Sequence, residues 1–197
     1  MEIRENVPIA SLTTMRLGGN ARYVISVKTP GEIAQAYDFA RKRGLATWMM
    51  GGGANTIGHD EGFAGVIILN EIKGIFVKQG DGLVAVEDAD RKKLGDEIIL
   101  TGMGGESWDD FVRMACDLGY SGIEALSMIP GTLGAAPVQN IGAYGQDISQ
   151  VIVSAEAYDT QTEQVITIEK NEMRLSYRRS RFNYGEDKGR FVIFAVT

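Results

Sequence analysis

Cysteine and histidine are almost absent from this chain, which contains only Cys116 and His59. One cysteine excludes an internal disulfide and fits a reducing compartment. With a single imidazole and a single thiol, the usual ligand set of a zinc site is missing, so we expect no metal. Protease-like catalysis by serine or cysteine would need His59 as its base. His59 falls in a polar loop, so we expect it to be solvated, and we expect Cys116 to be buried in a helix.

An excess of positive charge and a long apolar run are also lacking. Lys and Arg total 20 against 26 Asp and Glu, and the net charge of −6 argues against a general nucleic-acid surface. No apolar run approaches the length of a membrane span, and Met1–Glu5 lacks the apolar stretch of a signal peptide. We therefore expect a cytoplasmic protein without nucleic-acid or membrane partners. Its 197 residues can bury a sizeable core, as one domain or two small ones.

Glycine, in contrast, is plentiful, and it is concentrated in Ser127–Gly145, which we call the second glycine loop. Its four glycines and three alanines bury little apolar area. They let a flat or phosphorylated ligand approach backbone N–H groups, and they admit a positive φ. Gln139, Asn140 and Tyr144 remain to orient such a ligand. A long structural turn is the alternative interpretation, although uncharged loops of this length are usually functional.

A shorter cluster, Gly51–Thr56, is called here the first glycine loop. It follows a βαβ pattern made of a strand at 21–28, a helix from residue 30 and a buried strand at 46–50. Ligands of open α/β sheets collect at the carboxyl ends of strands, so this loop is placed to hold a phosphate. It is not a Walker A loop, nor a complete G-x-G-x-x-G, because position 56 is threonine. The motif alone supports a plain turn equally well.

Two helices are predicted from their caps and from apolar spacing. Thr29 and Glu32 form a capping-box pattern, and so do Ser107 and Asp110. The expected buried faces are Ile33, Ala36, Tyr37 and Ala40 in the first helix, which Gly44 ends, and Phe111, Met114, Ala115 and Leu118 in the second, which Gly119 ends. Further strands are expected at 65–69, 74–78, 83–87, 98–102, 151–158, 163–168 and 190–197, with a charged solvated loop at 88–96.

The segment Ser176–Arg181 concentrates positive charge in this acidic chain. Three arginines in four residues stand beside Tyr177 and two hydroxyl groups. Taken alone, this pattern is more typical of a solvated basic turn than of a binding site.

Together these stretches resemble the FAD-dependent UDP-N-acetylenolpyruvoylglucosamine reductases, also called UDP-N-acetylmuramate dehydrogenases. The second glycine loop is similar to their flavin-lining signature, Pro-x-Gln-Asn-x-Gly-Ala-Tyr-Gly. Leu12–Gly19 resembles the opening of the family, the first glycine loop its phosphate loop, Gly122–Glu124 the lead-in to the signature, and Tyr177–Ser180 the catalytic arginine motif. The motifs occur in the family's order and span nearly the whole chain.

The resemblance implies an α+β fold in which two α/β subdomains clasp one FAD, as in vanillyl-alcohol-oxidase-like flavoproteins. The first subdomain would cover residues 1–71 and the second residues 72–197. Pattern alone supports only a mixed α/β protein. The residues implied for FAD binding are Gly51, Gly52, Gly53, Ala54, Asn55, Thr56, Pro130, Gly131, Gly134, Ala135, Ala136, Asn140, Gly142, Ala143, Tyr144 and Gly145.

The implied reaction belongs to peptidoglycan synthesis. NADPH would be the hydride donor, and the hydride would pass through FAD to the enolpyruvyl ether of UDP-N-acetylglucosamine enolpyruvate. By resemblance, Arg178 is the catalytic arginine beside the substrate carboxylate, and Tyr177 and Arg178 bind substrate. The family takes its proton donor from a third, substrate-binding domain, which the sequence up to Thr197 does not include. We therefore expect this chain to bind FAD with little or no steady turnover.

Two residues depart from the family pattern. Ala54 stands where the family has serine, so one hydroxyl donor to the FAD diphosphate is lost, and a charge-assisted hydrogen bond is worth ~1.5–3 kcal/mol. Arg179 stands where the family has aspartate, which changes the charge beside Arg178. Two other functions stay open: a different flavin oxidoreductase on the same scaffold, and a non-catalytic FAD- or nucleotide-binding module.

Overall fold

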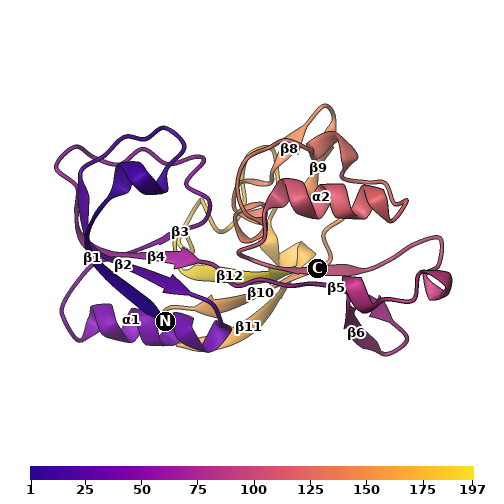
Figure 1. The fold of residues 1–197 in the computed structure, drawn as a ribbon, viewed down its shortest axis with the longest axis horizontal. Coiled ribbons are helices and arrows are strands. Elements are labelled where there is room, and N and C mark those ends of the chain that lie inside the picture. Colours follow the sequence, from indigo (N-terminus) through magenta and orange to yellow (C-terminus); the bar gives the residue numbers. More distant parts are fainter.

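A computed structural model describes residues 1–197, and its strands form two main sheets joined by a short link at residues 71–74. Figure 1 shows the first sheet on the left and the second on the right. The mixed fold class expected from the sequence is confirmed. The first sheet has the order β1-β2-β4-β3, with β1 at Glu2–Pro8, β2 at Asn20–Val27, β3 at Thr47–Met50 and β4 at Phe63–Asn70.

The predicted βαβ unit is present, with one strand inserted into it. β2 and β3 are parallel but not adjacent, because β4 pairs in parallel with both of them. β4 is buried on both faces over Gly65–Asn70, which fits a central parallel strand rich in Val, Ile and Leu. The first glycine loop directly follows β3, at the carboxyl end of these parallel strands.

Helix α1 runs from Pro30 to Arg41 between β2 and β3. It buries Ile33, Ala36 and Ala40, as the spacing predicts. Its predicted capping box is wrong in detail: the Thr29 side chain caps nothing, and the Glu32 carboxylate accepts from the amide of Lys28 at 2.7 Å and from the N-terminal amine at 2.5 Å. The N-terminal amine therefore binds the Glu32 carboxylate, which the sequence pattern assigns to the cap of α1.

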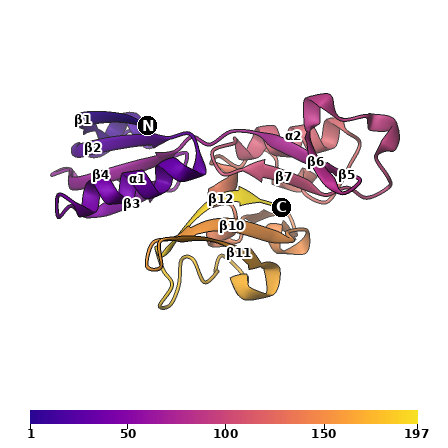
Figure 2. The same ribbon diagram turned by 90° about the horizontal axis from the view of Figure 1, so that it is seen from below.

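The second sheet has the order β11-β10-β12-β7-β5-β6 (Figure 2). All its pairings are antiparallel. The predicted strand at 83–87 is shorter than expected, because a 3-10 turn replaces it after Ala85. The strands are β5 at Ile75–Gln79, β6 at Gly82–Ala85, β7 at Leu100–Met103, β10 at Ser154–Asp159, β11 at Gln164–Glu169 and β12 at Phe191–Val196; β8 at Gly142–Ala143 and β9 at Gln146–Asp147 form a separate hairpin. The 3-10 helices are Ile9–Leu12, Val86–Asp88, Arg91–Lys93, Glu124–Leu126, Leu133–Ala135, Pro137–Gln139, Ile148–Gln150 and Lys170–Met173.

Helix α2, from Trp108 to Asp117, packs on this second sheet and corrects one prediction. Its buried stripe is Trp108, Phe111, Val112 and Ala115, so Met114 and Leu118 lie at its margin. Cys116 is exposed, so the expectation that it is buried is wrong. The Ser107 hydroxyl accepts from the Asp110 amide at 3.3 Å, which confirms one half of the expected box. The other half is missing, because the Asp110 carboxylate accepts from Arg113.

A shared core joins the two sheets. Ile33 of α1 and Ile68 of β4 belong to the same buried cluster as Tyr158 of β10 and Phe194 of β12. This shared cluster fixes the first sheet against β10 and β12 of the second sheet. The two glycine loops therefore lie where the two sheets meet. Both α-helices are too short and too polar to cross a membrane.

Candidate functional site

The two glycine loops meet at a cavity of about 310 Å³, called here the first cavity. A Cβ atom added to Gly52 would lie 3.3 Å from the Cα of Gly131, so the two backbones approach closely and leave little room for a side chain. Asn55 on the first loop donates to the side-chain oxygen of Gln139 on the second at 3.1 Å. Predicted residues lining this cavity are Gly51, Gly52, Gly53, Ala54, Asn55, Thr56, Pro130, Gly131, Gly134 and Ala135.

Glycine is required at position 53 for two reasons. Its φ of +64° is in the left-handed region, and an added Cβ would overlap the carbonyl oxygen of Leu12. The amide of Thr14 also donates to the carbonyl oxygen of Gly53 at 3.2 Å. The segment after β1 therefore supports the first glycine loop from behind and fixes its shape.

The N–H groups of the first glycine loop are available to a ligand. None of the six backbone amides of residues 51–56 donates a hydrogen bond within the protein. Successive free amides in a glycine-rich turn form an anion-binding concavity. No charged residue lines the first cavity, so backbone N–H groups would bind an anion there.

Thr132 brings a hydroxyl group to the first glycine loop, where residue 54 is alanine. An added Cβ on Gly51 would overlap the Thr132 hydroxyl oxygen, so that hydroxyl lies directly beside the first glycine loop. Thr132 also lines the first cavity. Free amides, a nearby hydroxyl and a glycine-lined space together fit a diphosphate.

The remaining predicted residues divide between a second cavity and the core. The second cavity, of about 350 Å³, is lined by Asn140, Gly142, Ala143, Tyr144, Gly145, Tyr177 and Arg178, with Gln146 and Asp147. Ala136 lines neither cavity and is only 2% exposed, within the core cluster beneath the second glycine loop.

Asn140 links the second glycine loop to the basic turn. It adopts a left-handed conformation with φ 45°, and it is buried. Its amide nitrogen donates to the carbonyl oxygen of Ser176 at 3.0 Å, and its amide oxygen accepts from the Ser149 amide at 3.2 Å. The side chain is therefore engaged within the protein, and its role in this structure is to position its neighbours.

Two exposed tyrosines line the second cavity. Tyr144 is 94% exposed and Tyr177 89% exposed, so neither contributes to the core. Tyr144 (φ 51°) and Gly145 (φ 85°) form the tight turn between β8 and β9, and Arg178 (φ 55°) is on the turn between Ser176 and Arg179. Holding non-glycine residues in this region costs of order 1–3 kcal/mol each, and such strain clusters at binding sites.

The turn that carries Tyr177 and Arg178 is fixed from below by Ser180. The buried Ser180 hydroxyl donates to the carbonyl oxygen of Val138 at 2.5 Å and accepts from the Phe182 amide at 3.0 Å. Asn183 accepts from the Ser180 amide at 2.9 Å and donates to the carbonyl oxygen of Arg178 at 3.2 Å. The basic turn is thus held against the second glycine loop by hydrogen bonds from side chains to the backbone, and none of them uses the Arg178 guanidinium, which lies 5.9 Å from the centroid of the Tyr177 ring.

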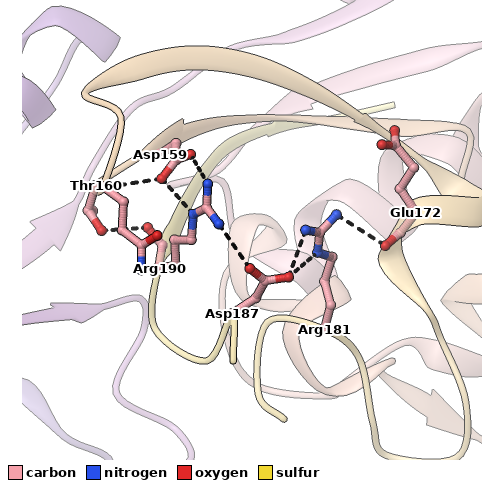
Figure 3. Close-up of polar contacts among 7 residues, drawn as sticks. Asp159, Thr160, Glu172, Arg181, Asp187 and Arg190 are labelled. Carbon is pink, nitrogen blue, oxygen red and sulfur yellow. Dashed lines mark hydrogen bonds and ion pairs between the residues drawn. The ribbon is translucent and has the colours of Figure 1, made fainter. Parts of the chain in front are cut away.

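A network of charges anchors the same segment to the second sheet (Figure 3). Arg190 donates to both carboxylate oxygens of Asp159, at 2.8 and 2.5 Å, and it also meets Asp187 at 3.2 Å. Asp187 in turn accepts from Arg181 at 2.9 Å. The hydrogen bonds from Arg190 hold the pKa of Asp159 far below its ordinary value, assisted by the amide of Gln161.

This network predicts a loss of stability in acid. A carboxylate whose pKa is lower in the folded than in the unfolded chain contributes stability that is complete well above about pH 4 and is lost as the pH falls further. We expect the free energy of unfolding to decrease between about pH 5 and pH 3, and the decrease to be smaller in an Asp159→Asn variant. Urea unfolding at pH 7, 5, 4 and 3 measures it. Parallel acid dependence in the two proteins would contradict this assignment.

Several residues of the site carry no clear signal in the sequence. Thr132 was within the second glycine loop but lacked a sequence signal that set it apart from its neighbours. Asn183 lines the first cavity and donates to the carbonyl oxygen of Arg178. It was not predicted because it lies far from both glycine loops in the sequence. Asn70 and Met50 reach the first cavity from the carboxyl ends of β4 and β3, where the parallel-strand rule would have placed them.

A family described as FAD binding domain matches residues 21–169. UDP-N-acetylenolpyruvoylglucosamine reductase of Streptomyces avermitilis is 38% identical over 191 residues, which cover 97% of this chain and 47% of that protein. The chain spans about half the length of the curated relatives it matches.

Solved structures share the fold. The structure of UDP-N-acetylenolpyruvylglucosamine reductase from Thermus caldophilus has a TM-score of 0.71 at 21% identity, covering 99% of this chain and 61% of that one. A VAO-type flavoprotein from Myceliophthora thermophila has a TM-score of 0.56 at 12% identity, covering 89% of this chain and 31% of that one.

Proposed function

The chain belongs to the FAD-binding domain family, and on that premise we propose that it forms the flavin-binding part of a UDP-N-acetylenolpyruvoylglucosamine reductase. FAD is the cofactor of this family. The observation that carries the proposal is the meeting of the two glycine loops at one cavity, with six unused amides on the first loop. The division into subdomains at residues 71 and 72 is part of the proposal, and it is supported by the two sheets, which lie on either side of that point.

The residues present fit the cofactor. The first glycine loop and the Thr132 hydroxyl would hold the FAD diphosphate, and the second glycine loop would pass along the rest of the cofactor. Bound FAD supplies the hydride that reduces the enolpyruvyl double bond, with NADPH as the donor. The proposed substrate is a nucleotide-linked sugar of the cytoplasmic stage of peptidoglycan synthesis. We therefore infer a cytoplasmic location for this chain.

Arg178 would act on the substrate. Its side chain lines the second cavity and has no carboxylate partner within the protein. A fixed guanidinium beside the enolpyruvyl carboxylate stabilises the negative charge that develops there as a hydride adds to the terminal carbon, before a proton reaches the carbon that bears the ether oxygen. Tyr177, on the same turn, would contribute a wall of the substrate site.

A single-turnover experiment tests this function. The FAD-loaded chain is reduced without oxygen and mixed with UDP-N-acetylglucosamine enolpyruvate, and the return of the oxidised flavin absorption is followed. We expect the substrate to reoxidise the flavin, and Arg178→Gln to slow this step by ~10²–10³, because one preorganised charge is lost.

The controls separate the proposal from its competitors. Arg91→Gln, an exposed arginine on the charged loop between β6 and β7, should leave the rate unchanged. The result would differ for another oxidoreductase on this scaffold: simple alcohols would reduce the flavin, and the enolpyruvyl substrate would not reoxidise it. A chain that takes up no FAD would leave the proposal without its basis.

A further inference from the structure

The four arginines between residues 178 and 190 form two pairs that differ in their partners, and one of them, Arg178, lines the second cavity. Arg181 and Arg190 are neutralised by Asp187 and Asp159 (Figure 3). Arg178 and Arg179 form no ion pair with any carboxylate, although the chain carries 26 acidic residues. One short segment thus contains both fully compensated and fully uncompensated cations.

Arg179 is held in place without being neutralised. Its guanidinium carbon lies 3.2 Å from the centroid of the Tyr184 ring, and Tyr184 is 62% exposed. A planar guanidinium stacks well on an aromatic face and keeps its hydrogen-bond donors free at its edge. The backbone of Arg179 pairs with Ser176 across the turn, through two hydrogen bonds of 2.9 and 3.0 Å. Both the main chain and the side chain are therefore fixed.

Two uncompensated cations on adjacent residues repel one another, and an anion relieves that repulsion. The substrate in the proposed function has two separate anionic groups, a carboxylate and a diphosphate, attached to one sugar ring. Arg178, which lines the second cavity, is the arginine assigned to the carboxylate. Arg179 remains for the other group.

We propose that Arg179, stacked on Tyr184, is a substrate-specificity residue that binds the diphosphate of the sugar nucleotide. The inference rests on the proposed function, and it names which part of the substrate each arginine recognises. The chemistry is that of a charge-assisted hydrogen bond between a guanidinium and a phosphate oxygen.

Calorimetric titration of the FAD-loaded chain with two partial ligands tests the assignment. UDP-N-acetylglucosamine has the diphosphate but no carboxylate, and 2-methoxyacrylate has the enol-ether carboxylate but no phosphate. We expect Arg179→Gln to weaken UDP-N-acetylglucosamine binding by about tenfold or more and to leave 2-methoxyacrylate unchanged, since one charge-assisted bond is worth ~1.5–3 kcal/mol. Arg178→Gln should give the reverse pattern.

Further variants sharpen the result. Arg179→Lys keeps the charge and should recover part of the affinity, whereas Arg91→Gln should change neither ligand. Raising the salt concentration should weaken UDP-N-acetylglucosamine binding less in Arg179→Gln than in the parent chain. Thermal unfolding of each variant checks that the exposed turn tolerates the change.

Several outcomes would overturn the inference. It fails if the parent chain binds no UDP-N-acetylglucosamine, or if Arg179→Gln weakens both partial ligands equally. A loss of FAD affinity in Arg179→Gln, with sugar-nucleotide binding intact, would make this arginine a cofactor contact. In each case FAD loading and flavin reoxidation by the full substrate stay measurable, so the proposed function is judged separately.

Discussion

Replacing Ala135 with phenylalanine is expected to weaken FAD binding about a hundredfold while the chain still folds. Ala135 is exposed, and its methyl group lines the first cavity opposite Gly51. A phenyl ring there would take up space within a cavity of about 310 Å³. Forcing extra atoms into a fitted space costs about 1–3 kcal/mol, and each 1.4 kcal/mol is about a factor of ten in affinity.

Ala135 is a sharper probe than the glycines of the first loop. A valine at Gly53 would overlap the carbonyl oxygen of Leu12 and distort the loop before any ligand is added. The matched control is Ala64→Phe, an exposed alanine at the opposite end of β4 from the loops. Flavin fluorescence titration gives the affinity, and thermal unfolding reports the fold. Unchanged FAD affinity in Ala135→Phe would mean that the cofactor does not occupy the first cavity.

The Asp159→Asn variant is expected to lose about 3 kcal/mol of stability at neutral pH. The Asp159 side chain is 3% exposed and Arg190 26% exposed, so the amide would remove the closer counter-charge of a partly buried guanidinium and leave it only Asp187 at 3.2 Å. Removing one partner of a buried pair costs about 3–5 kcal/mol, and the partial exposure of Arg190 favours the lower end. In a chain of this size, 3 kcal/mol lowers the Tm by about 6–12 °C.

An exposed ion pair provides the comparison. Asp38 pairs with Arg41, and both side chains are about half exposed. Asp38→Asn should therefore cost less than about 1 kcal/mol. Urea unfolding of both variants at pH 7 measures the difference. Equal losses in the two variants would show that the network around Asp159 gives no special stability to the segment that carries Arg178.

Sequence patterns identified most elements of this fold where burial follows a simple period. β2, β4 and β12 are rich in branched apolar residues, and their bounds match the predictions within two residues. β1 was missed, because its charged residues surround an Ile3 that stays 40% exposed and its main support is the ladder to β2. The insertion of β4 between β2 and β3 was also missed, because spatial order depends on pairings between distant segments.

The errors in the helices came from tertiary contacts. The buried face of α2 includes Trp108 and Val112, which the spacing argument omitted, and Cys116 is exposed although the apolar pattern predicts its burial. The indole nitrogen of Trp108 donates to the carbonyl oxygen of Leu126 at 2.8 Å, so a distant segment helps to set the orientation of the helix. Periodicity in a ten-residue helix leaves such a rotation undetermined.

The candidate site was predictable in its parts but not in its arrangement. Glycine content and the position after a parallel strand identified the first glycine loop, and resemblance identified Arg178. The sequence did not indicate that Asn140 would be used within the protein, nor that the arginines would separate into compensated and free pairs. Both facts depend on partners such as Ser176, Asp159 and Asp187, which only the folded chain brings within hydrogen-bond distance.

The most direct test of the central claim is a titration of the purified chain with FAD, followed through flavin fluorescence and the visible absorption band. If the two glycine loops hold the cofactor, the signal will saturate at one FAD per chain, and ADP will compete, because it presents the same diphosphate to the free amides of residues 51–56. A signal that does not saturate, or that ADP leaves unchanged, would contradict the assignment of the diphosphate to the first glycine loop.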